Sequence, residues 1–219
     1  MEKQVDILII GAGISGIGLA VHLSKNCPQR KFEILERRES FGGTWDLFRY
    51  PGIRSDSDMS TFGFNFKPWA KDKVLASGAE IKGYLSDVIS ENQLKDKIHF
   101  GHRVLSANYD STKKKWLVEI EGNNKKKQTW SANFVMGCTG YYNYDQGYAP
   151  KFPKQEDFKG QFIHPQHWPE NLDYTGKKVV IIGSGATAIT LVPSMVKGGA
   201  GHVTMLQRSP TYIATVPSI

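Results

Sequence analysis

A glycine-rich turn between an apolar segment and a helical segment constrains the fold of this chain most strongly. Residues 5–10, VDILII, form a short apolar run typical of a buried parallel strand, and residues 14–26 have the pattern of a helix. Between them lies Gly11-x-Gly13-x-x-Gly16. The first glycine permits the tight turn, the second lets the backbone approach a pyrophosphate, and the third lets helix and strand pack closely. The segment therefore predicts a nucleotide-binding crossover of the α/β class.

An acidic residue follows this turn at the distance that a dinucleotide site requires. Residues 32–36, FEILE, predict a second parallel strand, and Glu36 ends it. A carboxylate at that place can accept hydrogen bonds from an adenosine ribose. The GxGxxG spacing alone is a weak signal, since a glycine turn can serve packing only, but that alternative does not explain Glu36. We therefore predict dinucleotide binding here.

The same design recurs later in the chain. The segment KVVIIGSGATAITLVPSMVKGGAGHVTMLQRS repeats the strand, turn, helix and strand, with Gly183-x-Gly185-x-x-Ala188 as its turn. Its second strand is followed by Arg208 where the first unit has an acid. An arginine there can pair with a ribose 2′-phosphate, which favours NADPH over NADH, although a surface arginine at a strand end is the alternative. Two such sites indicate a flavin reduced by a pyridine nucleotide.

Composition argues against several other classes of protein. The two cysteines, Cys27 and Cys138, form no CxxC or CxxxxC pair and no metal-binding spacing, so we expect neither a disulfide reductase nor a metal site. Much of the net charge of +7 lies in residues 113–115 and 125–127, beside strand-like segments. Neither run alternates with aromatic residues, so we predict no nucleic-acid partner. No apolar stretch of about 20 residues and no signal peptide is present, which favours a soluble cytoplasmic protein.

The spacing of apolar residues predicts the remaining helix and strands. Residues 79–97 predict a helix, and residues 98–110, 116–122 and 128–138 predict three strands joined in part by lysine-rich turns. Residues 41–58, FGGTWDLFRYPGIRSDSD, are too irregular for a helix or strand and predict a long functional loop.

Two further patterns resemble those of one enzyme family. FKGQFIHPQHWP resembles the FxGxxxHxxxWP fingerprint of type I Baeyer-Villiger flavoprotein monooxygenases, and GGTWDLFRYPGIRSD resembles a second pattern of that family. Ordinary flavin-containing monooxygenases usually carry another aromatic residue in place of Trp168. The resemblance extends over all 219 residues and is strongest to the ethionamide-activating monooxygenases of mycobacteria. The fingerprint residues are Phe158, Gly160, His164, Trp168 and Pro169.

The resemblance implies binding sites for FAD and NADPH. The FAD-binding residues that it implies are Gly11, Gly13, Ser15, Gly16, Glu36, Gly43, Thr44, Trp45, Asp46, Leu47, Asp56 and Val104. The NADP-binding residues that it implies are Arg54, Ser55, Asp56, Gly183, Ser184, Gly185, Ala186, Thr187, Ala188, Ile189, Gln207 and Arg208. Asp56 is the implied catalytic residue of this segment, and an active-site arginine is expected beyond Ile219.

The resemblance also implies an α/β architecture with two Rossmann-type dinucleotide-binding domains. We expect a FAD-binding domain with a small antiparallel sheet over residues 1–140, a linker that carries the fingerprint over residues 141–174, and the incomplete start of an NADPH-binding domain over residues 175–219.

The implied activity is NADPH-dependent monooxygenation through a C4a-peroxyflavin. A ketone would gain one atom of O2 and become an ester, or the sulfur of a sulfide or thioamide would be oxidised. Two alternatives stay open: an inactive nucleotide-binding fragment, which these 219 residues alone are expected to be, and an ordinary S- or N-oxygenating flavin monooxygenase. The expected partners are the small-molecule substrate and O2. Peripheral contact with the inner face of the cell membrane is a further expectation, and the oligomeric state stays open.

Overall fold

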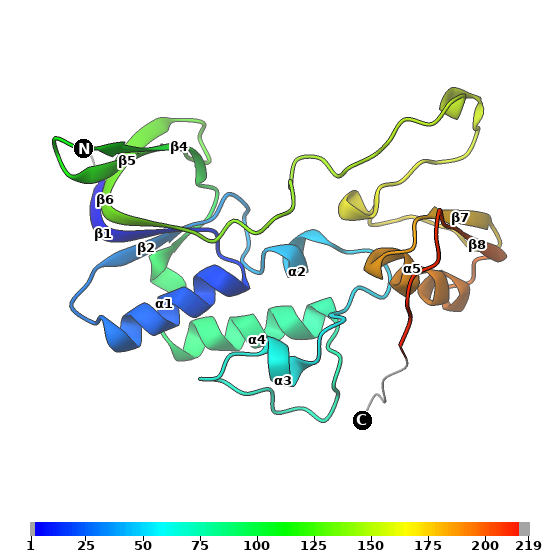
Figure 1. Ribbon diagram of the computed structural model, residues 1–219, viewed down its shortest axis with the longest axis horizontal. Helices are drawn as coiled ribbons and strands as arrows, with labels where there is room; N and C mark the ends of the chain where they lie inside the picture. The colour runs from blue at the N-terminus through cyan, green and yellow to red at the C-terminus, as the bar shows by residue number, and fades with distance from the viewer. Residues whose placement is uncertain (1–2, 215–219) are drawn as a thin grey trace. The chain divides into compact units, whose positions relative to one another are not determined.

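The computed structural model describes residues 3–214, which form two compact units (Figure 1). The first unit comprises residues 3–46 and 82–141, and the second comprises residues 47–81 and 142–214. Residues 47–81 thus group with the second unit, although the sequence boundary at residue 140 includes them in the first predicted domain. The role of each predicted domain in cofactor binding stays a prediction.

The first unit is built on a six-stranded mixed sheet in the order β3-β2-β1-β6-β5-β4. Strands β1, β2, β3 and the neighbouring β6 run parallel, whereas β4, β5 and β6 form an antiparallel meander. The antiparallel strands expected from the sequence are therefore continuous with the parallel sheet through β6. The strands span Lys3–Ile10 (β1), Phe32–Leu35 (β2), Ile98–His99 (β3), Arg103–Asp110 (β4), Lys115–Glu121 (β5) and Lys127–Gly137 (β6).

Two helices are drawn on the same side of the parallel strands (Figure 1). The first, α1, spans Ile14–Asn26, as its sequence pattern predicts, and buries Ile17 and Val21. The second, α4, spans Gly78–Glu91, so the predicted end at residue 97 is wrong. Gln93 adopts a left-handed φ of 52°, which ends the helix, and only a short 3-10 turn, η1, follows at Lys95–Lys97. Helical periodicity does not reveal a single left-handed residue.

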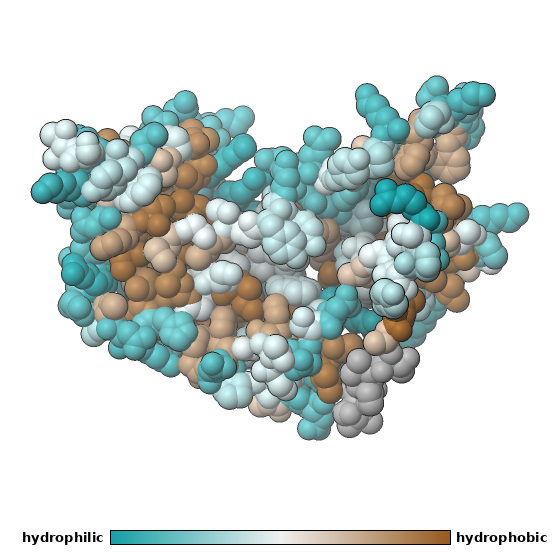
Figure 2. Space-filling view, in the orientation of Figure 1, coloured by the Kyte–Doolittle hydropathy of each residue, from teal (hydrophilic) through white to brown (hydrophobic). Residues whose placement is uncertain are grey.

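The core of the first unit lies where the antiparallel meander curls over the parallel strands. It contains fully buried residues such as Leu8, Val118 and Ile120, together with Trp130 at 3% exposure. Leu8 lies on β1, whose near-continuous hydrophobic sequence is typical of a parallel strand covered on both faces, whereas Val118 and Ile120 come from the antiparallel strand β5. Phe134 on β6 nevertheless stays 58% exposed, and Figure 2 shows brown apolar side chains around these strands.

The loop predicted over residues 41–58 contains one regular element that the sequence did not indicate. Thr44–Leu47 forms a single helical turn, α2, so the expectation of a wholly irregular segment is wrong. Gly42 and Gly43 take positive φ values of 114° and 57°, and their carbonyls accept the N–H groups of Trp45 and Asp46. One turn is too short to produce a detectable period. A second short helix, α3, spans Met59–Phe62 and is capped by the Asp58 side chain.

The second unit repeats the strand, helix and strand of the first. Parallel strands β7 (Lys178–Ile182) and β8 (His202–Leu206) flank α5, which spans Ala186–Lys197. The segment before β7 is irregular apart from the 3-10 turns η2 (Gln155–Asp157) and η3 (Pro165–His167). The core joins both parts of the unit, with members Leu47, Phe48, Tyr50, Leu191 and Met195. Within residues 3–214, no helix has the length and hydrophobicity needed to cross a membrane.

Candidate dinucleotide-binding sites

The first glycine turn joins β1 to α1 in the geometry that its spacing predicts. Gly11 has a φ of 107°, and its N–H donates to the Leu35 carbonyl at 2.8 Å. A Cβ added at Gly11 would overlap the carbonyl oxygen of Cys138, and one added at Gly16 would overlap that of Gly11. The fold itself therefore requires the first and third glycines of the motif.

Gly13 differs from its two neighbours in the motif, because the protein leaves room for a side chain there. Its φ of −81° and ψ of −172° are extended values that any residue adopts. An added Cβ would lie 3.6 Å from the Cα of Gly43, an ordinary van der Waals contact. The space next to the Cα of Gly13 is therefore a cradle that a Cβ would fill. This cradle lies at the N-terminus of α1, and the N–H groups at the start of a helix favour the binding of an anion. These residues fit the pyrophosphate of FAD.

Glu36 is a buried carboxylate of this site that is held by hydrogen bonds to the backbone. The side chain is 4% exposed, and its oxygens accept the N–H groups of Ala12 and Arg38, each at 2.9 Å. Each carboxylate oxygen has a second lone pair that can accept a ribose hydroxyl. The glycine turn and the end of β2 thus fix the orientation of the carboxylate before any ligand binds.

Replacing Glu36 with glutamine tests this carboxylate. An amide leaves one of the two backbone N–H groups without its acceptor and cannot accept equally from the ribose, so the full-length protein should lose about 1 to 3 kcal/mol of FAD affinity. That loss corresponds to a roughly 5- to 150-fold higher Kd, measurable by titrating the apoprotein with FAD. Glu33→Gln is the matched control, because Glu33 lies on the same strand but pairs with His99 at 2.7 Å. Equal FAD affinities in the two variants would contradict the assignment.

A buried carboxylate network beside this turn was not anticipated from the sequence. Asp46, expected to lie beside the flavin, is 3% exposed and accepts hydrogen bonds from Arg38 Nη2 at 2.6 Å and from Lys82. Burial opposes ionisation, but the hydrogen bonds from Lys82 and Arg38 outweigh it and hold the pKa of Asp46 below its usual value. The network fixes α2 to the turn after β2. The only sequence signal for this network was that Arg38 lies two residues after Glu36.

The other residues implied for FAD are distributed over both units. Ser15 is exposed in the first turn of α1, and Val104 is half-buried where the pairing of β4 shifts register. Thr44 and Trp45 lie in α2, while Leu47 belongs to the core of the second unit. The FAD set is therefore brought together in the first unit except for Leu47 and Asp56.

The second glycine turn has a backbone geometry similar to that of the first. Gly183 has a φ of 128° and donates its N–H to the Leu206 carbonyl at 2.8 Å. Gly185 has a φ of −77° and a ψ of −177°, close to the values of Gly13. A Cβ added at either glycine would meet no atom within 4 Å. The helix N-terminus is thus open for the approach of a phosphate group, and these residues fit the pyrophosphate of NADPH.

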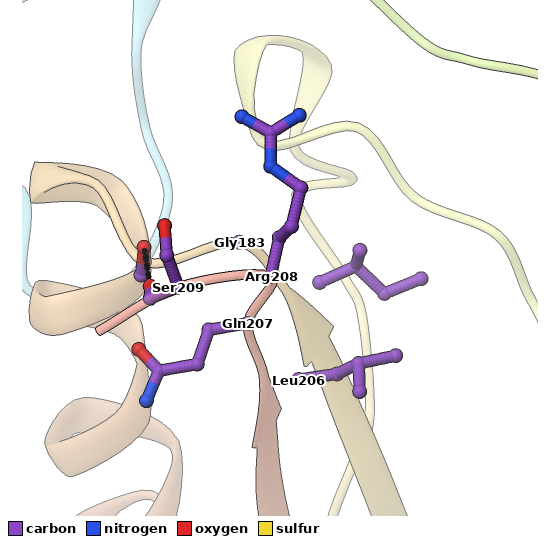
Figure 3. Close-up of a pocket in the computed structure, with 7 residues that line it drawn as sticks. Gly183, Leu206, Gln207, Arg208 and Ser209 are labelled. Carbon is purple, nitrogen blue, oxygen red and sulfur yellow. Dashed lines mark hydrogen bonds between the residues drawn. The ribbon is translucent and has the colours of Figure 1, made fainter. Parts of the chain in front are cut away.

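A pocket of about 460 Å³ opens beside this turn, within the range of about 300 to 1,000 Å³ typical of small-molecule sites. Figure 3 shows Arg208 and Gln207 projecting to opposite sides of the chain after β8. The Ser184 hydroxyl donates to the Ser209 carbonyl at 3.4 Å, which joins the turn to the segment after β8. Ser209 was not predicted as a site residue. The lining residues are Ile182, Gly183, Ser184, Leu206, Gln207, Arg208 and Ser209.

The residues implied for the region between flavin and nicotinamide lie in the second unit. Arg54 and Asp56 form an exposed ion pair at 3.9 Å. Ser55 between them is 4% exposed, and its hydroxyl donates to the Ser57 carbonyl at 2.9 Å. The remaining residues implied for NADP begin α5: Ala186 is exposed, Thr187 and Ile189 are half-buried, and Ala188 is buried.

The fingerprint segment contains a buried, hydrogen-bonded glutamine that the sequence analysis did not predict. Gln166, only 3% exposed, donates from Nε2 to the Asn143 carbonyl at 2.5 Å, and its N–H donates to His164 Nδ1 at 3.2 Å. Trp168 packs against the core of the second unit, whereas Phe158 is 57% exposed. Gly160 lies against the ring of Phe158, and Pro169 follows Trp168.

Comparisons with known proteins match this arrangement. A family model described as pyridine nucleotide-disulphide oxidoreductase matches residues 8–218. The chain is 99% identical to a probable FAD-binding monooxygenase, AlmA, of an Acinetobacter species and 56% identical to the FAD-containing monooxygenase EthA of Mycolicibacterium smegmatis, in both cases over its whole length. It spans 44% of the length of each of these curated relatives.

A solved structure of a monooxygenase is also similar to this chain. Cyclohexanone monooxygenase from Rhodococcus sp. Phi1, bound to NADP+, is 29% identical, with a TM-score of 0.81 over 97% of this chain and 39% of that one.

Proposed function

Because the chain belongs to the pyridine nucleotide-disulphide oxidoreductase family, we propose that it is the cofactor-binding part of a Baeyer-Villiger flavoprotein monooxygenase that uses FAD and NADPH. One observation carries this proposal: the two glycine turns share their backbone geometry but differ in the charge that follows. Glu36 is acidic and suits the ribose of FAD, whereas Arg208 is basic and suits the 2′-phosphate of NADPH. The two cysteines offer no dithiol for the disulfide branch of the family.

The chain's own residues would hold and orient the two cofactors. Gly13 and the N-terminus of α1 would receive the pyrophosphate of FAD, and Glu36 would accept its ribose hydroxyls. Gly185 and the N-terminus of α5 would receive the pyrophosphate of NADPH. Asp56, paired with Arg54, would lie between the flavin and the nicotinamide, and the arginine that stabilises charge at the reacting centre would belong to the rest of the protein.

Bound FAD supplies electron acceptance from NADPH and activation of O2. In the overall reaction one oxygen atom enters the substrate, the other leaves as water, and NADPH provides two electrons. We propose a ketone substrate converted to an ester, with sulfides and thioamides as further substrates. The solved structures of cyclohexanone monooxygenase support the ketone, since one is described as bound to cyclohexanone and another to ε-caprolactone, the corresponding cyclic ester.

The fingerprint segment would couple movement of the NADPH-binding part to the reaction. Support comes from Trp168, which packs on the core that includes residues of α5, and from Gln166, whose side-chain amide donates to the Asn143 carbonyl near the start of the predicted linker. His164 caps η3 through its ring nitrogen, which supports a role for this side chain in shaping the segment.

The proposal is tested on the full-length protein with cyclohexanone, methyl phenyl sulfide and ¹⁸O2. We expect a flavin absorbance spectrum, NADPH oxidation that depends on the ketone, and one ¹⁸O atom in the ester product. Oxygenation of the sulfide with no reaction of any ketone would instead indicate an ordinary S-oxygenating enzyme. A colourless protein without NADPH-dependent O2 consumption would indicate a nucleotide-binding remnant.

A further inference from the structure

The turn formed by residues 50–52, here called the YPG turn, packs on α5. Tyr50 is 5% exposed and lies in the apolar core with Leu191 and Met195 of α5. The N–H of Ile53 donates to the Tyr50 carbonyl at 3.2 Å, which closes the turn, and the Ile53 side chain packs against the same core. Apolar side chains at both ends of the turn therefore hold it on the helix.

Gly52 makes the closest contact between the YPG turn and α5. Its φ of 81° lies in the region that favours glycine. An added Cβ would overlap the Ser194 hydroxyl and lie 3.1 Å from Ser194 Cβ and 3.2 Å from Thr190 Cγ2. The Ser194 hydroxyl donates to the Thr190 carbonyl at 2.8 Å, so the helix itself holds it in place. The backbone of Gly52 is otherwise open to solvent, and the side on which a side chain would project is the side that meets α5.

The segment that follows the YPG turn is fixed from a second direction. Arg54 forms an antiparallel bridge with Ser77, and the N–H of Ser55 donates to the Ala76 carbonyl at 2.9 Å. The side chains of Arg54 and Asp56 are nevertheless 46% and 54% exposed. Their backbone is thus held in place while their charged groups stay open to a ligand.

Helix α5 joins this segment to the second glycine turn. Gly185 precedes the first residue of α5, where the pyrophosphate of NADPH would bind, and Thr190 and Ser194 lie further along the same helix. A helix rises 1.5 Å per residue, so Ser194 lies about 14 Å along the axis from Gly185. Because the helix is rigid, seating the YPG turn on it fixes the distance from the pyrophosphate site to Arg54 and Asp56.

We propose that Gly52 is a positioning residue, which seats the YPG turn on α5 and so holds Arg54 and Asp56 where the nicotinamide half of NADPH binds. This inference rests on the proposed function, because it assumes that the turn at Gly185 binds the pyrophosphate of NADPH. A nicotinamide amide carries both donors and an acceptor, which a carboxylate and a guanidinium complement. Displacing the YPG turn should therefore weaken contacts with the nicotinamide half and leave the adenosine half unaffected.

Gly52→Ala in the full-length, FAD-loaded protein tests the proposal, because the new Cβ pushes the turn away from Ser194. The Kd of NADP+ should rise roughly 2- to 13-fold by calorimetry, the equivalent of one hydrogen bond. The Kd of 2′-phospho-ADP-ribose, which lacks the nicotinamide ring, should stay at the wild-type value. In stopped-flow measurements, hydride transfer from NADPH to FAD should slow by up to about 100-fold, since a displacement of about 1 Å can cost that much. FAD should be retained.

Two further variants separate the contact with α5 from backbone strain at Gly52. Ser194→Gly, added to Gly52→Ala, removes the two atoms closest to the new Cβ but leaves the positive φ, so it should restore NADP+ affinity and most of the reduction rate. Gly176→Ala is the matched control. Gly176 belongs to the same unit and has a φ of 68°, but an added Cβ there meets nothing within 4 Å, so both ligands should bind as to the wild type.

Three results would overturn the inference while leaving the proposed function standing. They are wild-type NADP+ affinity and reduction rate in Gly52→Ala, equal losses of NADP+ and 2′-phospho-ADP-ribose, and no recovery with Ser194→Gly. If Gly52→Ala does not fold, Ser194→Leu decides by the same measurements, because it enlarges the other side of the contact without straining the turn. Failure of the wild-type protein to bind either ligand would overturn both the inference and the proposed function.

Discussion

Gly13→Ala in the full-length protein should strongly reduce the retention of FAD without disturbing the fold. Gly13 has an extended backbone, and a Cβ there meets only Gly43 at an ordinary distance, so the protein itself tolerates the change. The bound pyrophosphate does not, because the new methyl group occupies the space that the motif leaves for it. Overpacking costs about 1 to 3 kcal/mol, so FAD affinity should fall roughly 5- to 150-fold, and valine should lower it further.

Flavin absorbance after desalting measures the retained FAD, and thermal unfolding of the apoprotein reports the fold. Gly83→Ala is the matched control, since Gly83 lies within α4 and an added Cβ there meets nothing within 4 Å. That variant should keep its flavin and gain a few tenths of a kcal/mol or more from helix propensity. If Gly13→Ala retained as much flavin as the control, the first turn would not be a pyrophosphate site.

Arg208→Ala should raise the KM of NADPH about 10- to 150-fold while hardly changing that of NADH. A guanidinium can hold a 2′-phosphate through two charge-assisted hydrogen bonds, and the loss of such contacts costs about 1.5 to 3 kcal/mol. NADH has only a hydroxyl at that position. Arg208→Lys should keep part of the preference, since it retains the charge but not the planar fork.

Steady-state kinetics with both nucleotides decides the outcome. Arg49→Ala is a suitable control, because Arg49 belongs to the same unit and forms an exposed ion pair with Glu170, at 3.5 Å. Surface pairs of that kind contribute little, so its effect on both KM values should be small. An equal loss of NADPH and NADH in Arg208→Ala would mean that Arg208 supports the fold and does not contact the 2′-phosphate.

The features that local sequence determines were predicted, and those that depend on distant residues were not. Helix α1 spans the predicted residues 14–26 because its glycine turn and Cys27-Pro28 mark both ends. The contacts of Asp46 with Arg38 and Lys82 depend on how α4 folds back, which no local pattern encodes.

The two glycine motifs also show what sequence spacing can predict and what only the three-dimensional structure reveals. Their spacing predicted both turns, and backbone geometry alone then separated the glycines that the fold requires, Gly11 and Gly16, from Gly13, which it does not. The burial of Tyr50 against α5 joins segments far apart in the chain, so the sequence could mark the YPG pattern but not its packing against Leu191 and Met195.

The discontinuous second unit has a consequence for synthesis of the protein. Leu47, Phe48 and Tyr50 leave the ribosome long before Leu191 and Met195, the residues of α5 that bury them. Contacts between segments so distant in the chain form slowly, because the intervening loop must close first. During that interval the three apolar side chains stay open to solvent or to other nascent chains, which exposes the intermediate to aggregation. Limited chaperone capacity should therefore lower the soluble yield by trapping chains stalled before α5.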